Sequence, residues 1–248
     1  MKTMQVFLTL FISLVFSITC WGQIAQNETS ITSEDGFILR GIFFSSGKKG
    51  PGILLLHQCN RSGEKTGYEN LEPLLALNGF NTLVLDSRGF GKSTDETYRD
   101  YRSQMDLIDT KVQLDVEAAF RFLSTQPHVD PQRIGIVGAS CGTWASIPLA
   151  KRHPEIRALV FLSGSYLGLG QQELDYDALV QRPVLTIYSE EDRYRTPESM
   201  KDAFSRSKNK NSKLIAYKGS LHGTLLLDND KNLEKEIVRW LQARLIGE

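Results

Sequence analysis

The sequence predicts an α/β fold with a mostly parallel sheet, and three patterns in the chain support this prediction. Short, continuous apolar runs recur along the chain, as expected for strands that are covered on both faces. Amphipathic stretches of helical period separate these runs, so strand and helix alternate through right-handed crossovers. Residues 31–44 alternate in a way that favours an antiparallel hairpin, with its turn at residues 34–36. We therefore expect one sheet with helices on both faces.

The expected strands are the apolar runs and the expected helices are the stretches between them. The strands cover residues 52–56, 82–85, 134–137, 158–162, 184–188 and 213–217. The helices cover about residues 69–78, 110–126, 142–152, 197–207 and 230–246. In the second helix an apolar face forms at three- and four-residue spacing, from Val112 to Leu123. No repeat or linker divides residues 27–248, so we expect a single domain over that range.

Composition and charge are those of an ordinary globular protein. Hydrophobic residues make up 41% of the 248 residues and charged residues make up 23%. Lysine plus arginine and aspartate plus glutamate each number 29, and the basic runs are short. We therefore do not expect a nucleic-acid partner.

The first 22 residues are predicted to be a cleaved signal peptide. Lys2 precedes an apolar run from Val6 to Ile18, and the chain becomes polar from Gln23. The run is shorter than the roughly 20 residues that span a bilayer. We expect an exported protein, periplasmic or secreted, with no stable membrane span after cleavage. Two alternatives stay open, namely a lipid anchor on Cys20 and an uncleaved N-terminal anchor.

The predicted architecture indicates where a reactive site must lie. Loops that follow the strands of a parallel sheet meet at one edge, and ligand sites form there. Residues 138–142 read Gly-Ala-Ser-Cys-Gly and lie between a predicted strand and a predicted helix. This pattern is typical of a sharp turn that raises a serine hydroxyl above the sheet. Ser140 is therefore the candidate nucleophile.

A serine hydroxyl needs an adjacent base, and the four histidines allow a choice by elimination. His128 precedes a strand and His153 ends a helix, which puts both at the wrong edge. His57 follows the first central strand, where we expect it to hold the shape of its loop. His222 follows the last strand, on a glycine-flanked turn, and is our candidate general base.

The third member of the site must be a carboxylate that orients the histidine. Three acids follow the strand at 184–188, and Asp192 is the best placed, with Glu190 and Glu191 as rivals. Asp86 also follows a strand, but it begins the segment Asp-Ser-Arg-Gly-Phe-Gly-Lys-Ser. We interpret that segment as a rigid loop held by its aspartate and arginine.

The order Ser140, Asp192, His222 resembles that of the α/β-hydrolase superfamily. The loop that begins at His57 resembles the family's His-Gly loop. Residues 86–93 resemble its D-x-R-G-x-G-x-S segment, and residues 219–223 resemble its G-x-x-H-G segment. The resemblance implies the α/β-hydrolase fold and an active site at the strand-following edge.

The length of one connection narrows this resemblance. Only about twenty residues separate Phe161 from Val184, too few for a large helical cap. The sequence is therefore similar to capless, dienelactone-hydrolase-like or small serine esterase-like members. Three residues depart from the family pattern: Gln58 and Ser189 replace glycines, and Ser140 stands where this subgroup often has cysteine.

The resemblance also implies an oxyanion hole formed by the backbone N–H groups of Cys59 and Cys141. We expect these cysteines to be independent small residues. The alternative is that they pair in an oxidising compartment, where the bond distorts the hole and switches activity off.

The resemblance implies hydrolysis of a small-molecule carboxylic ester through an acyl-enzyme on Ser140. The alternatives are a peptidase or amidase of the same fold and a catalytically silent binding protein. No cofactor or metal is expected, because no His/Cys cluster has zinc spacing. Substrate choice is expected to depend on loops 60–68, 94–105 and 164–178. These loops contain the tyrosines Tyr98, Tyr101, Tyr166 and Tyr176. Their rings either line a pocket or pack the loops against the fold.

Overall fold

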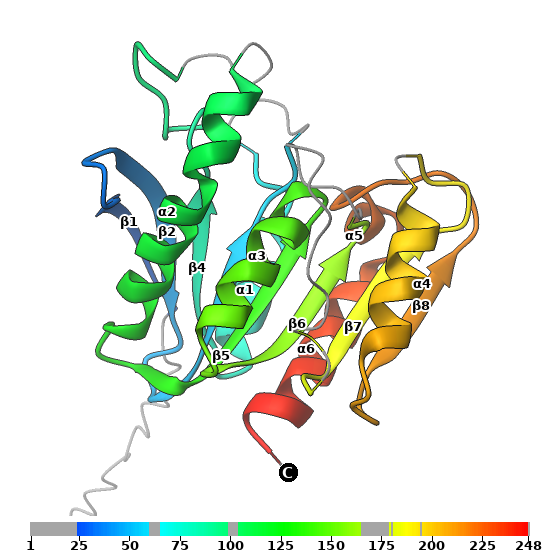
Figure 1. Cartoon of the computed structure of the whole chain (residues 1–248). Helices are drawn as coiled ribbons and strands as arrows, with labels where there is room; N and C mark the ends of the chain where they lie inside the picture. Colours follow the sequence, from blue (N-terminus) through cyan, green and yellow to red (C-terminus); the bar gives the residue numbers. More distant parts are fainter. Residues whose placement is uncertain are drawn as a thin grey trace, which may run out of the picture.

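The chain folds around one eight-stranded sheet, seen in Figure 1 from the side of helices α2 and α3. The computed structural model describes residues 24–59, 65–98, 104–164, 179, 181–193 and 195–247. The strands are β1 (Ala25–Thr32), β2 (Ile38–Ser45), β3 (Gly50–Leu56), β4 (Asn81–Asp86), β5 (Val129–Ala139), β6 (Ile156–Leu162), β7 (Val184–Ser189) and β8 (Lys213–Tyr217). The helices are α1 (Leu71–Leu77), α2 (Met105–Ser124), α3 (Cys141–Arg152), α4 (Thr196–Arg206), α5 (Leu225–Asn229) and α6 (Lys231–Leu245).

The sheet is antiparallel at one edge and parallel elsewhere. Its strand order is β1-β2-β4-β3-β5-β6-β7-β8. Strand β2 pairs antiparallel with both β1 and β4, and all further pairs are parallel. The predicted hairpin is confirmed, and its turn is closed by a hydrogen bond from the N–H of Gly36 to the carbonyl of Ser33, 2.9 Å.

Helices cover both faces of the sheet, as predicted. Alternate residues of one strand point to opposite faces. Leu54 and Leu56 of β3 belong to the core layer beneath α2, α3 and α4, whereas Ile53 and Leu55 belong to the layer beneath α1, α5 and α6. Because both sets are buried, the strand reads as one continuous apolar run.

Three elements differ from the sequence prediction. Strand β1 begins at Ala25, earlier than the predicted hairpin. The sequence does not indicate this first part of the strand, because it is exposed and polar and carries no apolar alternation. Helix α2 begins at Met105 rather than Thr110, and both Leu107 and Thr110 in its first turns are exposed. Burial therefore produces the amphipathic pattern only further along that helix. Helix α5 was missed because five residues are too few to show a helical period.

The ends of the parallel strands bring their following loops together at the upper edge of the sheet in Figure 1. In the pairing of β3 with β5, Leu56 lies opposite Gly138. In the pairing of β5 with β6, Ala139 lies opposite Leu162. This edge carries the candidate site.

Candidate active site

Ser140 lies at a tight turn between β5 and α3. Its backbone has φ 51° and ψ −115°, a region that non-glycine residues rarely adopt and that costs about 1–3 kcal/mol. Its N–H donates to the carbonyl of Leu162 at 2.8 Å, which fixes the turn to the neighbouring strand. The structure therefore holds this serine in a strained conformation at the end of a central strand.

The glycines on both sides of Ser140 are required by close backbone contacts. A Cβ on Gly142 would lie 2.2 Å from the carbonyl oxygen of Leu56. A Cβ on Gly138 would lie 2.6 Å from the carbonyl oxygen of Gly142. No larger residue fits at either position without moving backbone atoms. The Gly-x-Ser-x-Gly spacing is thus a packing requirement of this turn.

His222 contacts the serine from the loop between β8 and α5. Its Nε2 lies 2.8 Å from the Oγ of Ser140. Its Nδ1 lies 2.9 Å from both carboxylate oxygens of Asp192. With Nδ1–H donating to the carboxylate, Nε2 carries the lone pair that accepts the serine proton. The three residues thus form the contacts that a nucleophile, a base and an orienting acid require.

Asp192 is buried beside the histidine, whereas the side chains of Glu190 and Glu191 are exposed. The two glutamates contribute through their backbones. The N–H of Glu190 donates to Tyr217 at 2.8 Å, and the N–H of Glu191 donates to Gly219 at 2.9 Å. These bonds tie the loop after β7 to the loop that carries His222.

His57 holds its loop, as predicted. It is 2% exposed, and its Nε2 accepts from the N–H of Ser87 at 3.0 Å. Its Nδ1 therefore carries the proton and donates to the carbonyl of Gln58 at 2.8 Å. The segment that begins at Asp86 is also held as predicted, because the Oδ2 of Asp86 accepts from the backbone N–H of Lys92 at 2.8 Å.

Arg88 fixes that segment to the rest of the fold. Its guanidinium is 1% exposed and forms ion pairs with Asp35 at 2.8 Å and Asp115 at 2.6 Å. The ion pair with Arg88 holds the pKa of Asp35 well below its usual range. Tyr98 packs edge-on against Phe37 and beneath the same guanidinium, so this tyrosine packs its loop against the fold.

The expectation of independent cysteines is wrong, because Cys59 and Cys141 form a disulfide with 5.8 Å between their Cα atoms. Strand pairing explains the contact. Leu56 and Gly138 are opposite each other in adjacent parallel strands, and each cysteine follows its strand residue by three positions. Once β3 and β5 are recognised as neighbours, equal offsets predict that the two cysteines meet.

Gln58 stands at a position where the α/β-hydrolase family usually has glycine, and its side chain has a defined hydrogen-bond partner. Its Oε1 accepts from the backbone N–H of Thr224 at 2.9 Å, and the residue is 6% exposed. A Cβ on Gly223 would lie 1.8 Å from the same oxygen and would displace it, and Gly223 has a φ of 61°, which favours glycine. Gln58 therefore links the loop after β3 to the His222 loop.

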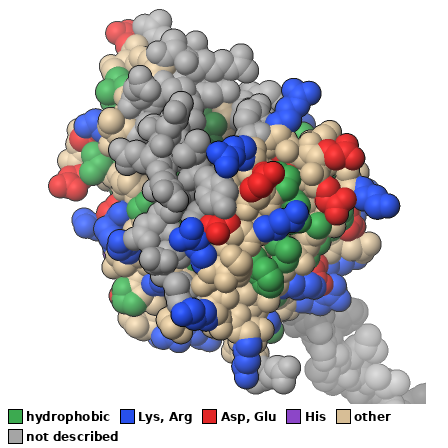
Figure 2. Space-filling view, turned by 45° about the vertical axis from the view of Figure 1, so that its right-hand side comes forward, with side chains coloured by type: hydrophobic (Ala, Val, Ile, Leu, Met, Phe, Trp, Pro, Cys, Tyr) green, Lys and Arg blue, Asp and Glu red, His purple; other side chains and the backbone are tan. Residues whose placement is uncertain are grey.

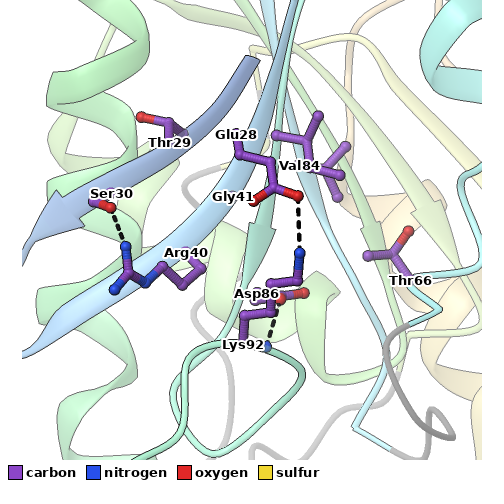
Figure 3. Close-up of a pocket in the computed structure, with 10 residues that line it drawn as sticks. Glu28, Thr29, Ser30, Arg40, Gly41, Thr66, Val84, Asp86 and Lys92 are labelled. Carbon is purple, nitrogen blue, oxygen red and sulfur yellow. Dashed lines mark hydrogen bonds and ion pairs between the residues drawn. The ribbon is translucent and has the colours of Figure 1, made fainter. Parts of the chain in front are cut away.

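A cavity of about 340 Å³ lies away from these residues, against the β1–β2–β4 part of the sheet (Figure 3). Its charged side chains contact one another or neighbouring polar groups: Lys92 pairs with Glu28 at 2.8 Å, and Arg40 donates to Ser30. No residue of the Ser140–His222–Asp192 set lines it.

Several predicted features fall outside the described residues. These are the signal peptide with Cys20, most of the loops expected to set substrate choice, and the tyrosines at positions 101, 166 and 176. Within the described part of the chain, no cluster of three or more His, Cys, Asp or Glu side chains is arranged to hold a metal ion. None of the described helices has the length and hydropathy to cross a bilayer.

The sheet order and the turn at Ser140 define an α/β-hydrolase fold, and solved structures share it. A dienelactone hydrolase from Anabaena variabilis aligns with a TM-score of 0.72 at 20% identity, covering 90% of this chain and 99% of that one. The Pyrococcus furiosus esterase Pf2001 aligns with a TM-score of 0.71 at 18% identity, covering 89% and 93%.

The family model of the dienelactone hydrolase family matches residues 40–240. The chain therefore belongs to the dienelactone hydrolase family, the family that its sequence resembles. Among curated proteins, the thiohydrolase apmlB of Arthrinium phaeospermum is 32% identical over 126 residues, which are 51% of this chain and 39% of that protein. In this relative and in the other curated relatives that the chain matches, the matched region spans less than half of the relative's length.

Proposed function

We propose that this hydrolase cleaves small-molecule carboxylic esters through an acyl-enzyme on Ser140. The observation that carries the proposal is the unbroken contact series from Ser140 Oγ to His222 Nε2 and from His222 Nδ1 to Asp192. The series needs no group from outside the described chain. It sits at the strand-following edge, where α/β folds place their ligands.

The acylation step follows from these contacts. Ser140 Oγ attacks the ester carbonyl carbon while His222 Nε2 takes the hydroxyl proton. The carbonyl oxygen becomes an oxyanion, which the backbone N–H groups of Cys59 and Cys141 stabilise. The tetrahedral intermediate then expels the alkoxide, and the imidazolium of His222 returns its proton to that leaving group. Asp192 stabilises the imidazolium throughout.

Deacylation repeats the sequence with water. His222 takes a proton from a water molecule, which attacks the acyl carbon and forms a second oxyanion. The intermediate collapses, releases the carboxylic acid and returns the proton to Ser140 Oγ. The proton transfers of both half-reactions run through the contacts among Ser140, His222 and Asp192, which supports the proposed cycle.

Ester, thioester and amide bonds are all open to this chemistry, and a thiohydrolase is among the relatives. We propose the oxygen ester over the peptide amide. A peptidase needs a means of holding a peptide terminus, and the sequence predicts a single domain over residues 27–248. On the face in Figure 2, basic, acidic and hydrophobic side chains are interspersed over the described surface. This mixture favours a small neutral substrate over a polyanion.

The site of action that we propose is outside the cytoplasm. The Cys59–Cys141 disulfide supports it, because such bonds persist in oxidising compartments and are rare in reducing ones. The predicted signal peptide at residues 1–22 points the same way.

The proposal is tested with a matched set of butyryl substrates: a 4-nitrophenyl ester, a thiocholine ester and a 4-nitroanilide. We expect the oxygen ester to be turned over fastest and Ser140→Ala to lose that turnover. Ser146→Ala is the control, because its hydroxyl donates to the carbonyl of Thr143 within α3, and it should stay active. Preference for the anilide would support the amidase alternative, and an inactive wild type would support the silent binding protein.

A further inference from the structure

The Cys59–Cys141 disulfide joins the two residues whose backbone N–H groups are assigned to the oxyanion. Cys141 is the first residue of α3, directly after Ser140. Cys59 follows the end of β3 by three positions. Their Cα atoms lie 5.8 Å apart, within the usual range for a disulfide. A covalent bond therefore crosses the site at the two positions that determine where these N–H groups point.

Each of the two N–H groups is a backbone donor of the kind that can bind an oxyanion. The N–H of a first helical residue has no acceptor within its helix, and the helix dipole favours an anion there. Among the described residues, no hydrogen-bond acceptor is found for the N–H of Cys141 or of Cys59. The helix position alone fixes only one of these donors.

The donor at Cys59 depends on what holds its loop. The segment leaves β3 beside the turn at Gly142, which lies against the carbonyl of Leu56. Gln58 then bonds to Thr224 on the histidine loop at 2.9 Å. The disulfide is the next contact along the chain. Cys59 therefore lies between two anchors, one to the general-base loop and one to the nucleophile turn.

We propose that the Cys59–Cys141 disulfide is a positioning cross-link for the oxyanion hole, so that the rate of hydrolysis depends on the oxidation state of these cysteines. The inference rests on the proposed function of Ser140. It contradicts the alternative in which pairing distorts the hole and switches activity off. The contacts from Ser140 to His222 and Asp192 are complete with the bond formed.

Reduction separates the two donors while the three acid–base residues stay in place. A phosphine reductant supplies two electrons, water supplies two protons, and one S–S bond becomes two thiols while the phosphine becomes its oxide. Cys59 is half-buried and Cys141 is buried, so Cys59 is the more exposed residue of the pair. A displacement near 1 Å at a catalytic group costs up to about 100-fold in rate. We therefore expect kcat to fall about 10- to 100-fold on reduction, with KM changed less than about threefold.

The test compares oxidised protein, protein reduced with tris(2-carboxyethyl)phosphine, and the double variant Cys59→Ala/Cys141→Ala. Steady-state hydrolysis of 4-nitrophenyl butyrate gives kcat and KM. Inhibition by an alkyl trifluoromethyl ketone is measured in parallel, because Ser140 adds to it and creates an oxyanion in the hole. A cross-link that only stabilises the fold would not change this affinity in folded protein. The double variant treated with phosphine is the matched control and should not change.

Folding is controlled separately, because the bond also closes a chain segment with a sequence separation of 82. All assays are run at a temperature where circular dichroism shows the reduced protein to be folded. We expect kcat and ketone affinity to fall by similar factors, and reoxidation to restore both in the wild type. Unchanged kcat in the reduced protein, a higher kcat, or a loss that tracks only the unfolded fraction would each overturn the inference. If oxidised wild type itself hydrolyses no ester, the proposed function fails instead.

Discussion

Glu72 gives a stability prediction whose magnitude follows from the structure. The residue lies in the first turn of α1 and is 4% exposed. Burial, together with the nearby carboxylate of Glu69, raises the pKa of Glu72 to about 7 from its ordinary value of 4.5. The helix N-terminus typically favours an ionised carboxylate by up to about 1 kcal/mol, so the desolvation of the carboxylate determines the direction of the pKa shift.

The sign follows from proton binding in the two states. Between pH 4.5 and 7 the folded protein holds a proton on Glu72 that the unfolded chain has lost. The contribution of Glu72 to the free energy of unfolding therefore falls as pH rises through this window. The full loss is roughly 3 kcal/mol, of which about 2 kcal/mol develops between pH 5.5 and pH 8.

Glu72→Gln removes this titration and keeps a group that accepts from the hydroxyl of Thr66. We expect the variant's free energy of unfolding, relative to wild type, to increase by about 2 kcal/mol from pH 5.5 to pH 8. Urea unfolding followed by circular dichroism at both pH values measures it. Glu198→Gln, at an exposed first-turn position of α4, should shift stability by less than about 0.5 kcal/mol at either pH. An equal Glu72→Gln effect at both pH values would refute a protonated Glu72.

Two further substitutions probe the site and the fold. Asp192→Asn should lower kcat for ester hydrolysis by about 10³- to 10⁴-fold with KM little changed, because an amide no longer holds the tautomer of His222. Retained turnover in the folded variant would contradict the role given to Asp192. Arg88→Met leaves Asp115 buried without its cation and should lower the free energy of unfolding by about 3–5 kcal/mol in urea titrations. Arg121→Met, which breaks an exposed ion pair, should cost less than about 1 kcal/mol, and equal losses would count against the buried pair.

The sequence was enough to predict the layered fold because burial on two faces leaves a visible trace. The run at 52–56 is apolar at every position after Gly52, and its residues pack alternately on the two helix layers. Where a segment is buried on one side or not at all, the sequence shows no continuous apolar run. Strand β1 and the first turns of α2 were therefore missed or shortened.

The candidate site was predictable to the extent that it depends on chain order. Ser140 and His222 follow central and final strands, and only one edge of a parallel sheet can bring such loops together. The choice of Asp192 over Glu190 was less determined, because two residues of offset decide which side chain turns inward. The pairing of Cys59 with Cys141 required the order of β3 and β5, which a single sequence does not state.

The most direct test of the central claim is labelling by a fluorophosphonate, which reacts with an activated serine supported by an oxyanion hole. The purified oxidised protein is treated with the probe, digested and mapped by mass spectrometry, alongside Ser140→Ala. We predict one adduct, on the peptide that contains Ser140, and none in the variant. An adduct on another serine, or none on folded wild-type protein, would contradict it.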